Sequence, residues 1–125
     1  MQFTDNELKA IFKIAKAMVL VDGRVDKREL MEMADEMRRL GVSREKIEEL
    51  SLTTKEMDNT EALITISTLD DEKKIYVSSY LIMIMIVDGE MHEKEMILWE
   101  MTTALCGLPE VNVSDAIALM SSDLR

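Results

Sequence analysis

Two short stretches of this sequence gather carboxylates around a glycine. VDGRVDKRE runs from Val21 to Glu29, and VDGEMHEKE runs from Val87 to Glu95. Carboxylate oxygens that meet at a turn are ligands for hard cations such as Ca²⁺ and Mg²⁺. The same side chains also cap helix starts. Each stretch therefore indicates either a weak divalent cation site or a capped helix start.

The candidate metal ligands are the acids of the two turns: Asp22, Asp26 and Glu29 in the first, and Asp88 and Glu95 in the second. Ca²⁺ takes about six to eight oxygen ligands, so either turn needs water, or convergence with the other turn, to complete the shell. The pattern differs from an EF-hand loop, whose ligands alternate as D-x-D-x-D-G. Here the glycine follows the first aspartate at once.

Helix capping explains part of the same pattern without a metal. Asp26-x-x-Glu29 has capping-box spacing, worth about 1–2 kcal/mol. Acids near a helix N-terminus also interact favourably with the helix dipole, which accounts for Glu95. Asp22 and Asp88 fit this interpretation less well, because each stands at the end of a helix, where the dipole disfavours negative charge. Both interpretations stay open at this stage.

Helices are the elements that must position these turns. The chain has four glycines and one proline, and apolar residues recur at helical spacing. The segment ALITISTL, residues 62–69, is rich in β-branched residues, but we expect a helix because no partner strand is found elsewhere. The predicted helices cover about residues 4–22, 26–40, 43–50, 62–69, 70–88, 92–106 and 114–121. We therefore predict a single all-α domain over residues 1–125, a compact bundle of about seven helices.

The chain also contains an internal repeat. A shift of 66 positions aligns hairpin 5–42 with hairpin 71–108. The identities are Val21, Asp22, Gly23, Glu29 and Gly41, which fall on Val87, Asp88, Gly89, Glu95 and Gly107. The four glycines are predicted structural turns that end helices. The second copy has no charged residue between Lys74 and Asp88, so we expect it to form the buried centre.

The same pattern occurs twice: an apolar helix, then D-G-x-φ-x-x-x-E, where φ is an apolar residue, then a second helix that ends in G-φ. This pattern resembles the TerB-like family of tellurite-resistance proteins. The resemblance implies a compact bundle of about seven helices with internal pseudo-symmetry. It also implies metal-binding roles for Asp22, Glu29, Asp88 and Glu95, and a bacterial stress-response or membrane-associated setting. The family pattern expects a small or acidic residue at the helix start. Asp26 fits this, whereas His92 departs from it.

Charge and composition limit the functions to consider. The chain has 25 acids and 15 bases, a net charge of −10, and residues 88–125 hold eight acids but two bases. Nucleic-acid binding is therefore not expected, whereas cations or a basic partner would be attracted. The longest apolar run, residues 75–87, is shorter than the roughly 20 residues of a membrane span, so no transmembrane segment is expected. The start shows no signal peptide, and Cys106 is the single cysteine, so we expect a cytoplasmic protein with this thiol buried.

No catalytic motif accompanies these features: GxSxG and a phosphate-binding glycine loop are both missing. We therefore expect a non-enzymatic module that binds an unknown protein partner, with a weak Ca²⁺ or Mg²⁺ site at the turns. One alternative is a metal-dependent hydrolase that uses the acidic turns. Another is a purely structural homodimer module. The twelve methionines either fill the core or form an adaptable binding surface, and Trp99 is expected in the core or at an interface.

Overall fold

The computed structural model describes residues 2–21, 23, 26–87, 89 and 92–121. The all-α prediction is confirmed, because the regular structure of these residues is entirely helical. The elements are α1 (Asp5–Leu20), α2 (Lys27–Arg39), α3 (Arg44–Thr53), the 3-10 helix η1 (Thr54–Glu56), α4 (Asn59–Ser67), α5 (Asp71–Ile86), α6 (Glu93–Cys106) and α7 (Val113–Met120).

Side-chain caps fix where the helices begin. The predicted capping box of α1 is present: Thr4 Oγ1 accepts from the Glu7 N–H at 3.1 Å, and Glu7 Oε1 accepts from the Thr4 N–H at 2.8 Å. Asp58 caps α4 by accepting from the Glu61 N–H at 2.8 Å. The β-branched segment ALITISTL therefore lies mainly in a capped helix, as predicted. The remaining side-chain caps are Asp26, Ser43, Asp70 and Asn112.

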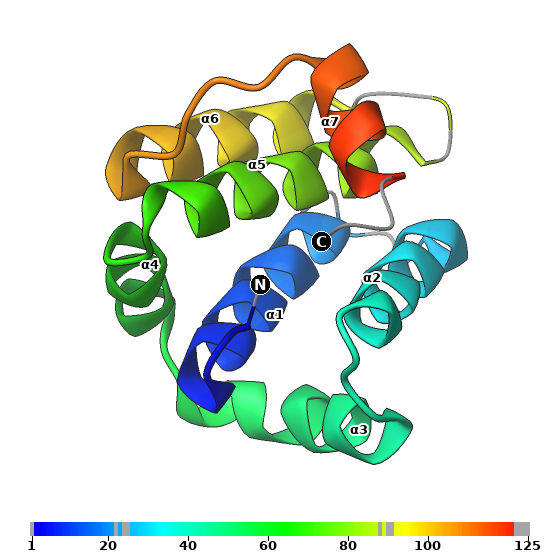
Figure 1. Cartoon of the computed structure of the whole chain (residues 1–125), viewed down its shortest axis with the longest axis vertical. Coiled ribbons are helices and arrows are strands. Elements are labelled where there is room, and N and C mark those ends of the chain that lie inside the picture. The colour runs from blue at the N-terminus through cyan, green and yellow to red at the C-terminus, as the bar shows by residue number, and fades with distance from the viewer. Residues whose placement is uncertain (1, 22, 24–25, 88, 90–91, 122–125) are drawn as a thin grey trace.

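Helices α1 and α5 form the centre of the bundle (Figure 1). α1 packs on α2, α3, α4, α5 and α6, and α5 packs on α1, α2, α6 and α7. Both central helices bury many residues, among them Met18 on α1 and Ile84 on α5, which have no exposed surface; the first turn of α5 contains no buried residue. The predicted buried helix over residues 75–87 is thus confirmed for α5. Within the described residues, no helix is both long and apolar enough to cross a bilayer.

Helix α6 does not share this burial. Its buried residues are Glu95, Thr102 and Cys106, whereas much of its surface is exposed. The expectation that the second hairpin as a whole would be the buried centre is therefore wrong for its second helix. Cys106 itself is buried as predicted, with Sγ 3.3 Å from the Leu63 carbonyl oxygen of α4. Burial raises the pKa of this thiol, opposed in part by the Lys74 charge.

A polar cluster, buried except for Arg39, joins α2 to α5 and α7. Tyr76 Oη donates to Glu36 Oε1 at 2.8 Å, and Tyr80 Oη donates to the Met33 carbonyl at 3.0 Å. Arg39 Nη1 lies 3.7 Å from Glu36 Oε2 and 3.4 Å from the Met120 carbonyl oxygen. Burial, together with the Glu36 and Glu32 carboxylates, raises the pKa of Tyr80 well above its ordinary value. This cluster fixes the position of α2.

The two hairpins pack across one another. α2 of the first hairpin packs on α5 of the second, and α6 of the second packs on α1 of the first. Glu7 and Lys73, which occupy equivalent positions 66 residues apart, meet through Glu7 Oε1 and Lys73 Nζ at 3.1 Å. Equivalent residues touch in this way near a two-fold axis. The duplicated hairpin stays a prediction, and these pairings support it.

Candidate functional site

The two predicted acidic turns have closely similar backbones at their glycines. Gly23 has φ +80° and Gly89 has φ +84°. Each glycine N–H returns to the end of its helix, Gly23 to the Leu20 carbonyl at 3.0 Å and Gly89 to the Ile86 carbonyl at 2.9 Å. The positive φ at these positions favours glycine over any residue with a Cβ. The candidate ligands Asp22 and Asp88 lie outside the described residues.

The two helix starts differ beyond the glycines. Asp26 caps α2, with Oδ1 accepting from the Arg28 N–H at 2.8 Å and from the Glu29 N–H at 3.4 Å. His92 occupies the same position before α6, and its side chain makes no capping hydrogen bond. The capping role predicted for Asp26 is therefore confirmed. His92, which departs from the family pattern at this position, therefore also differs from Asp26 in making no side-chain capping hydrogen bond.

Glu29 and Glu95 are both buried, with 2% and 1% of their surface exposed. Each lies in the first turn of its helix, where the helix dipole favours a negative charge. A carboxylate removed from water needs hydrogen-bond donors, a cation or a proton to compensate for lost hydration. An ordinary capping glutamate such as Glu7 stays partly exposed, so burial sets this pair apart. Sequence analysis identified both residues but not their burial.

The described residues do not assemble a metal-binding cluster. No group of three or more His, Cys, Asp or Glu side chains with suitable geometry occurs among them. α2 packs on α1, α3 and α5, whereas α6 packs on α1, α4 and α5. Neither of the two surface grooves described below is lined by Glu29 or Glu95. The cation prediction thus depends on Asp22 and Asp88, and the hydrolase alternative gains no cleft from this part of the chain.

The glycines at the other ends of the hairpins are also in the left-handed region. Gly41 has φ +86° and Gly107 has φ +64°. The residue after each glycine closes the helix end: the Val42 N–H reaches the Met37 carbonyl at 3.1 Å, and the Leu108 N–H reaches the Thr103 carbonyl at 3.0 Å. These are the bonds of a Schellman-type helix end. The predicted terminator role of both glycines is confirmed.

The outer face of α6 is the least expected feature of the surface. Ile97, Met101 and Leu105 follow one another at intervals of four residues and are 49%, 55% and 64% exposed. Residues at that spacing lie in a row on one side of a helix. We call this row the α6 stripe. Met96 is a further exposed residue of the helix, at 37%.

A groove with a volume of ≈ 700 Å³ runs beside the α6 stripe. One wall is α6 and the other is the connection to α7 with the first turn of that helix. Its lining residues are Trp99, Glu100, Thr103, Ala104, Leu108, Glu110, Val111, Asn112 and Asp115. We call it the acidic groove. Three of its residues are acids, and the part of the chain that the structure describes places no basic group within 4.0 Å of their carboxylates.

Two side-chain polar groups of the acidic groove are engaged within the protein. Thr103 Oγ1 donates to the Glu100 carbonyl at 2.9 Å, and Asn112 Oδ1 accepts from the Asp115 N–H at 2.7 Å. Ser78 Oγ of α5 donates to the Pro109 carbonyl at 3.0 Å and so anchors the far wall. Within the described residues the three carboxylates have no ion-pair partner, and an ionised carboxylate can only accept hydrogen bonds.

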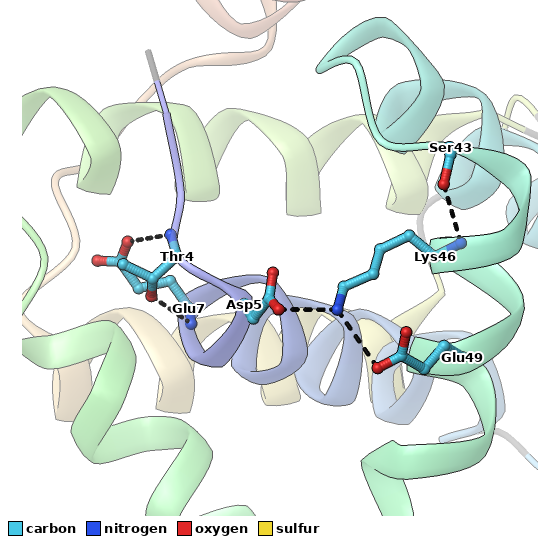
Figure 2. A network of polar contacts seen from close by, with 6 residues as sticks. All are labelled: Thr4, Asp5, Glu7, Ser43, Lys46 and Glu49. Carbon is cyan, nitrogen blue, oxygen red and sulfur yellow. Dashed lines mark hydrogen bonds and ion pairs between the residues drawn. The ribbon is translucent and has the colours of Figure 1, made fainter.

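A second groove, of ≈ 500 Å³, lies between the start of α1 and the α2–α3 connection. Its charges are already paired, as Figure 2 shows: Lys46 Nζ is 2.8 Å from Asp5 Oδ2 and 3.3 Å from Glu49 Oε1. The Asp5 interaction raises the pKa of Lys46. Ser43 Oγ is also engaged, because it accepts from the Lys46 N–H at 3.1 Å. We call it the paired groove.

Comparison with solved structures shows what the chain is related to. A crystal structure of a protein of unknown function from Porphyromonas gingivalis matches with a TM-score of 0.89 and 37% sequence identity. The match covers 98% of this chain and 92% of that one. The two proteins belong to one family. Neither the protein-family models nor the curated proteins give a match. The relative confirms the fold, and its own function is unknown.

Sequence analysis missed the α6 stripe and the acidic groove. The apolar residues at 97, 101 and 105 were visible, but an apolar row on a helix usually marks its buried face. The buried side of α6 is instead formed around Glu95, Thr102 and Cys106, two of which are polar. The acids of the groove come from two segments, so their spacing in the chain gave no signal. The methionines fall into two groups. Met33, Met37 and Met85 are in the core, whereas Met31 and Met101 are exposed.

Proposed function

We propose that this protein is a non-enzymatic interaction module that binds a partner protein through the outer face of α6. The observation that carries the proposal is the α6 stripe, where Ile97, Met101 and Leu105 are each about half exposed or more. Single exposed apolar residues are normal on protein surfaces. A row of them on one helix, beside a groove, is typical of a protein-binding surface.

Charge indicates that the partner is a different protein rather than a second copy. Each copy carries a net charge of −10, so association of two copies would bring like charges together. The exposed acids Glu93 and Glu100 lie on α6 itself, next to the stripe. Like charges facing one another across an interface are destabilising. A partner with basic residues around an apolar segment would meet complementary charge.

Site-directed cross-linking tests this proposal. A photo-reactive residue replaces Met101 on α6 or, as the matched control, Leu52 on α3, which is 69% exposed. We expect position 101 to cross-link a different protein in the source cells, and position 52 to give no such product. Equal products at both positions, or only cross-linked copies of this chain from position 101, would overturn the proposal. The second of these results would support the homodimer alternative.

A divalent cation at the acidic turns is the second candidate, favoured by the burial of Glu29 and Glu95. The resemblance to the TerB-like family, which we retain as part of this proposal, points to the same two residues together with Asp22 and Asp88. The helical fold and the matched glycine turns support that resemblance. A cation held by carboxylates of the turn and of the following helix would link the two.

Calorimetry distinguishes a cation site from helix capping. Ca²⁺ and Mg²⁺ are titrated into chelator-treated wild type and into the Asp22→Asn/Asp88→Asn variant. Saturable heat in the wild type that disappears in the variant would support a cation site. If neither ion binds, and Glu29→Ala or Glu95→Ala lowers the free energy of unfolding, the two carboxylates serve the helix starts alone.

A further inference from the structure

All the charged residues that line the acidic groove are acids. The Thr103 hydroxyl donates to the Glu100 carbonyl, and the Asn112 side-chain oxygen accepts from the Asp115 N–H. The charged groups that line the groove are the carboxylates of Glu100, Glu110 and Asp115. Since these groups accept hydrogen bonds and carry negative charge, phosphates, carboxylates and nucleic acid are poor ligands. A complementary ligand must supply positive charge and hydrogen-bond donors.

Apolar side chains between the acids restrict the ligand further. Trp99, Leu108 and Val111 also line the groove. Long basic side chains suit such a surface, because their aliphatic stems cover apolar groups while the charged ends reach carboxylates. Arginine and lysine also interact favourably with the face of an indole ring. A bare metal ion fits less well, because these carboxylates form no cluster of metal-binding geometry within the described chain.

In the paired groove of the same protein, the carboxylates already have a basic partner. There, Lys46 already lies 2.8 Å from the Asp5 carboxylate, as Figure 2 shows. No basic side chain plays this part for Glu100, Glu110 or Asp115 among the described residues. Lys74 lies instead at the C-terminal end of α6, where its Nζ would be 3.6 Å from a Cβ added to Gly107. Among the residues that the structure describes, the acidic groove therefore has the carboxylates of an ion pair without the cation.

We propose that the acidic groove receives lysine or arginine side chains from a basic amphipathic segment of a partner protein, while apolar residues of that segment cover the α6 stripe. The two surfaces are continuous, because Glu100 and Ala104 of the groove alternate along α6 with Met101 and Leu105 of the stripe. This inference rests on the proposed function and adds the partner's chemistry to it. The opposite charge of the segment provides the selectivity.

Trp99 makes the inference directly measurable, because it is the sole tryptophan of the chain and lines the groove. Its fluorescence is followed during titration with helical peptides of about 14 residues, which combine leucine on one face with arginine, lysine or glutamate on the other. We expect saturable binding of the arginine and lysine peptides that weakens with added salt, and none of the glutamate peptide. Failure of both basic peptides to bind would overturn the inference.

A matched pair of variants separates the groove from net charge. Glu100→Gln/Glu110→Gln/Asp115→Asn removes the groove acids, and Glu45→Gln/Glu56→Gln/Glu72→Gln removes the same charge from exposed acids elsewhere. The groove variant should bind the arginine peptide about tenfold or more weakly, and the control variant should change binding by about twofold or less. Equal weakening of both would show attraction by overall charge and overturn the inference. Glu110→Lys, a single change in the connection, should weaken binding by itself if the triple variant folds poorly.

The two proposals fail in different ways. If position 101 cross-links a partner whose affinity is unaffected by the groove variant, the α6 stripe binds protein but the groove does not select basic side chains. If the basic peptides bind in the groove but position 101 cross-links no protein, the groove chemistry stands and the proposed function fails.

Discussion

Helices α2 and α6 correspond to one another in the predicted internal repeat, but their exposed surfaces differ in chemistry. Both begin with a buried glutamate in the first turn and both end at a glycine with positive φ. A shift of 66 positions places Asp35, Arg38 and Arg39 of α2 on Met101, Ala104 and Leu105 of α6. All six residues are exposed. The same positions therefore face solvent in both helices, and only their chemistry differs.

The three charged residues at these α2 positions have partners within the protein. Arg38 Nη2 lies 3.0 Å from Asp35 Oδ1, and Arg39 reaches Glu36 and the Met120 carbonyl. The apolar residues at the same places on α6 have no comparable internal use, because they point away from the core. Exposing them has no benefit for folding, since burial of apolar surface is what stabilises a fold. The comparison teaches that matched helix positions can carry different chemistry: those of α2 hold ion pairs, and those of α6 carry the exposed apolar row on which our proposal of partner binding rests.

The largest expected effect concerns the shared scaffold. Met18→Ala on α1 and Ile84→Ala on α5, which occupy equivalent positions, should each lower the free energy of unfolding by about 2–5 kcal/mol. Both side chains are completely buried in central helices. Urea unfolding measures both losses. A loss below about 1 kcal/mol for either variant would contradict the equal central roles of α1 and α5.

A smaller effect is expected at the helix ends. Gly41→Ala and Gly107→Ala should each cost about 1–2 kcal/mol, because φ is positive at both sites. The space is sufficient in both cases: a Cβ at Gly41 meets nothing within 4 Å, and one at Gly107 meets Lys74 Nζ at 3.6 Å. Backbone strain is therefore the common cause. Thermal unfolding should give similar losses, and a much larger loss at one glycine would break the parallel between the hairpins.

The smallest effect concerns the point where the hairpins meet. Burial would raise the pKa of Glu7, but the hydrogen bond from the Thr4 N–H and the Lys73 ammonium lower it below 4.5 overall. Because the folded pKa is depressed, the stabilisation is present above about pH 4.5 and disappears as the pH falls through the folded value. Glu7→Gln keeps capping-box chemistry and should reduce the melting temperature at about pH 7, and less at a pH below the folded pKa of Glu7. A reduction of equal size at both pH values would exclude the ion pair as its cause.

Local signals made most of the fold predictable. Helix starts are marked by the Thr4-x-x-Glu7 box and the other cap residues, and helix ends by the four glycines. Each of these signals acts over a few residues. The candidate site was only partly predictable for the same reason. Asp26 acts locally and was assigned correctly, whereas the burial of Glu29 and Glu95 depends on how α2 and α6 pack on distant helices. The acidic groove joins α6 to the α7 segment, so only tertiary structure reveals it.

Exchanging the α6 surface for that of α2 tests the central claim most directly. Met101→Asp/Ala104→Arg/Leu105→Arg gives α6 the charged residues of α2 at positions that are already exposed. Asp35→Ala/Arg38→Ala, which removes an exposed ion pair from α2, is the control. The measurement is the affinity of each variant for the protein that cross-links at position 101. We expect the exchange to weaken binding by about tenfold or more, with unfolding unchanged, and the control to bind like the wild type. Unchanged affinity of the exchanged protein would contradict the assignment of α6 as the binding surface.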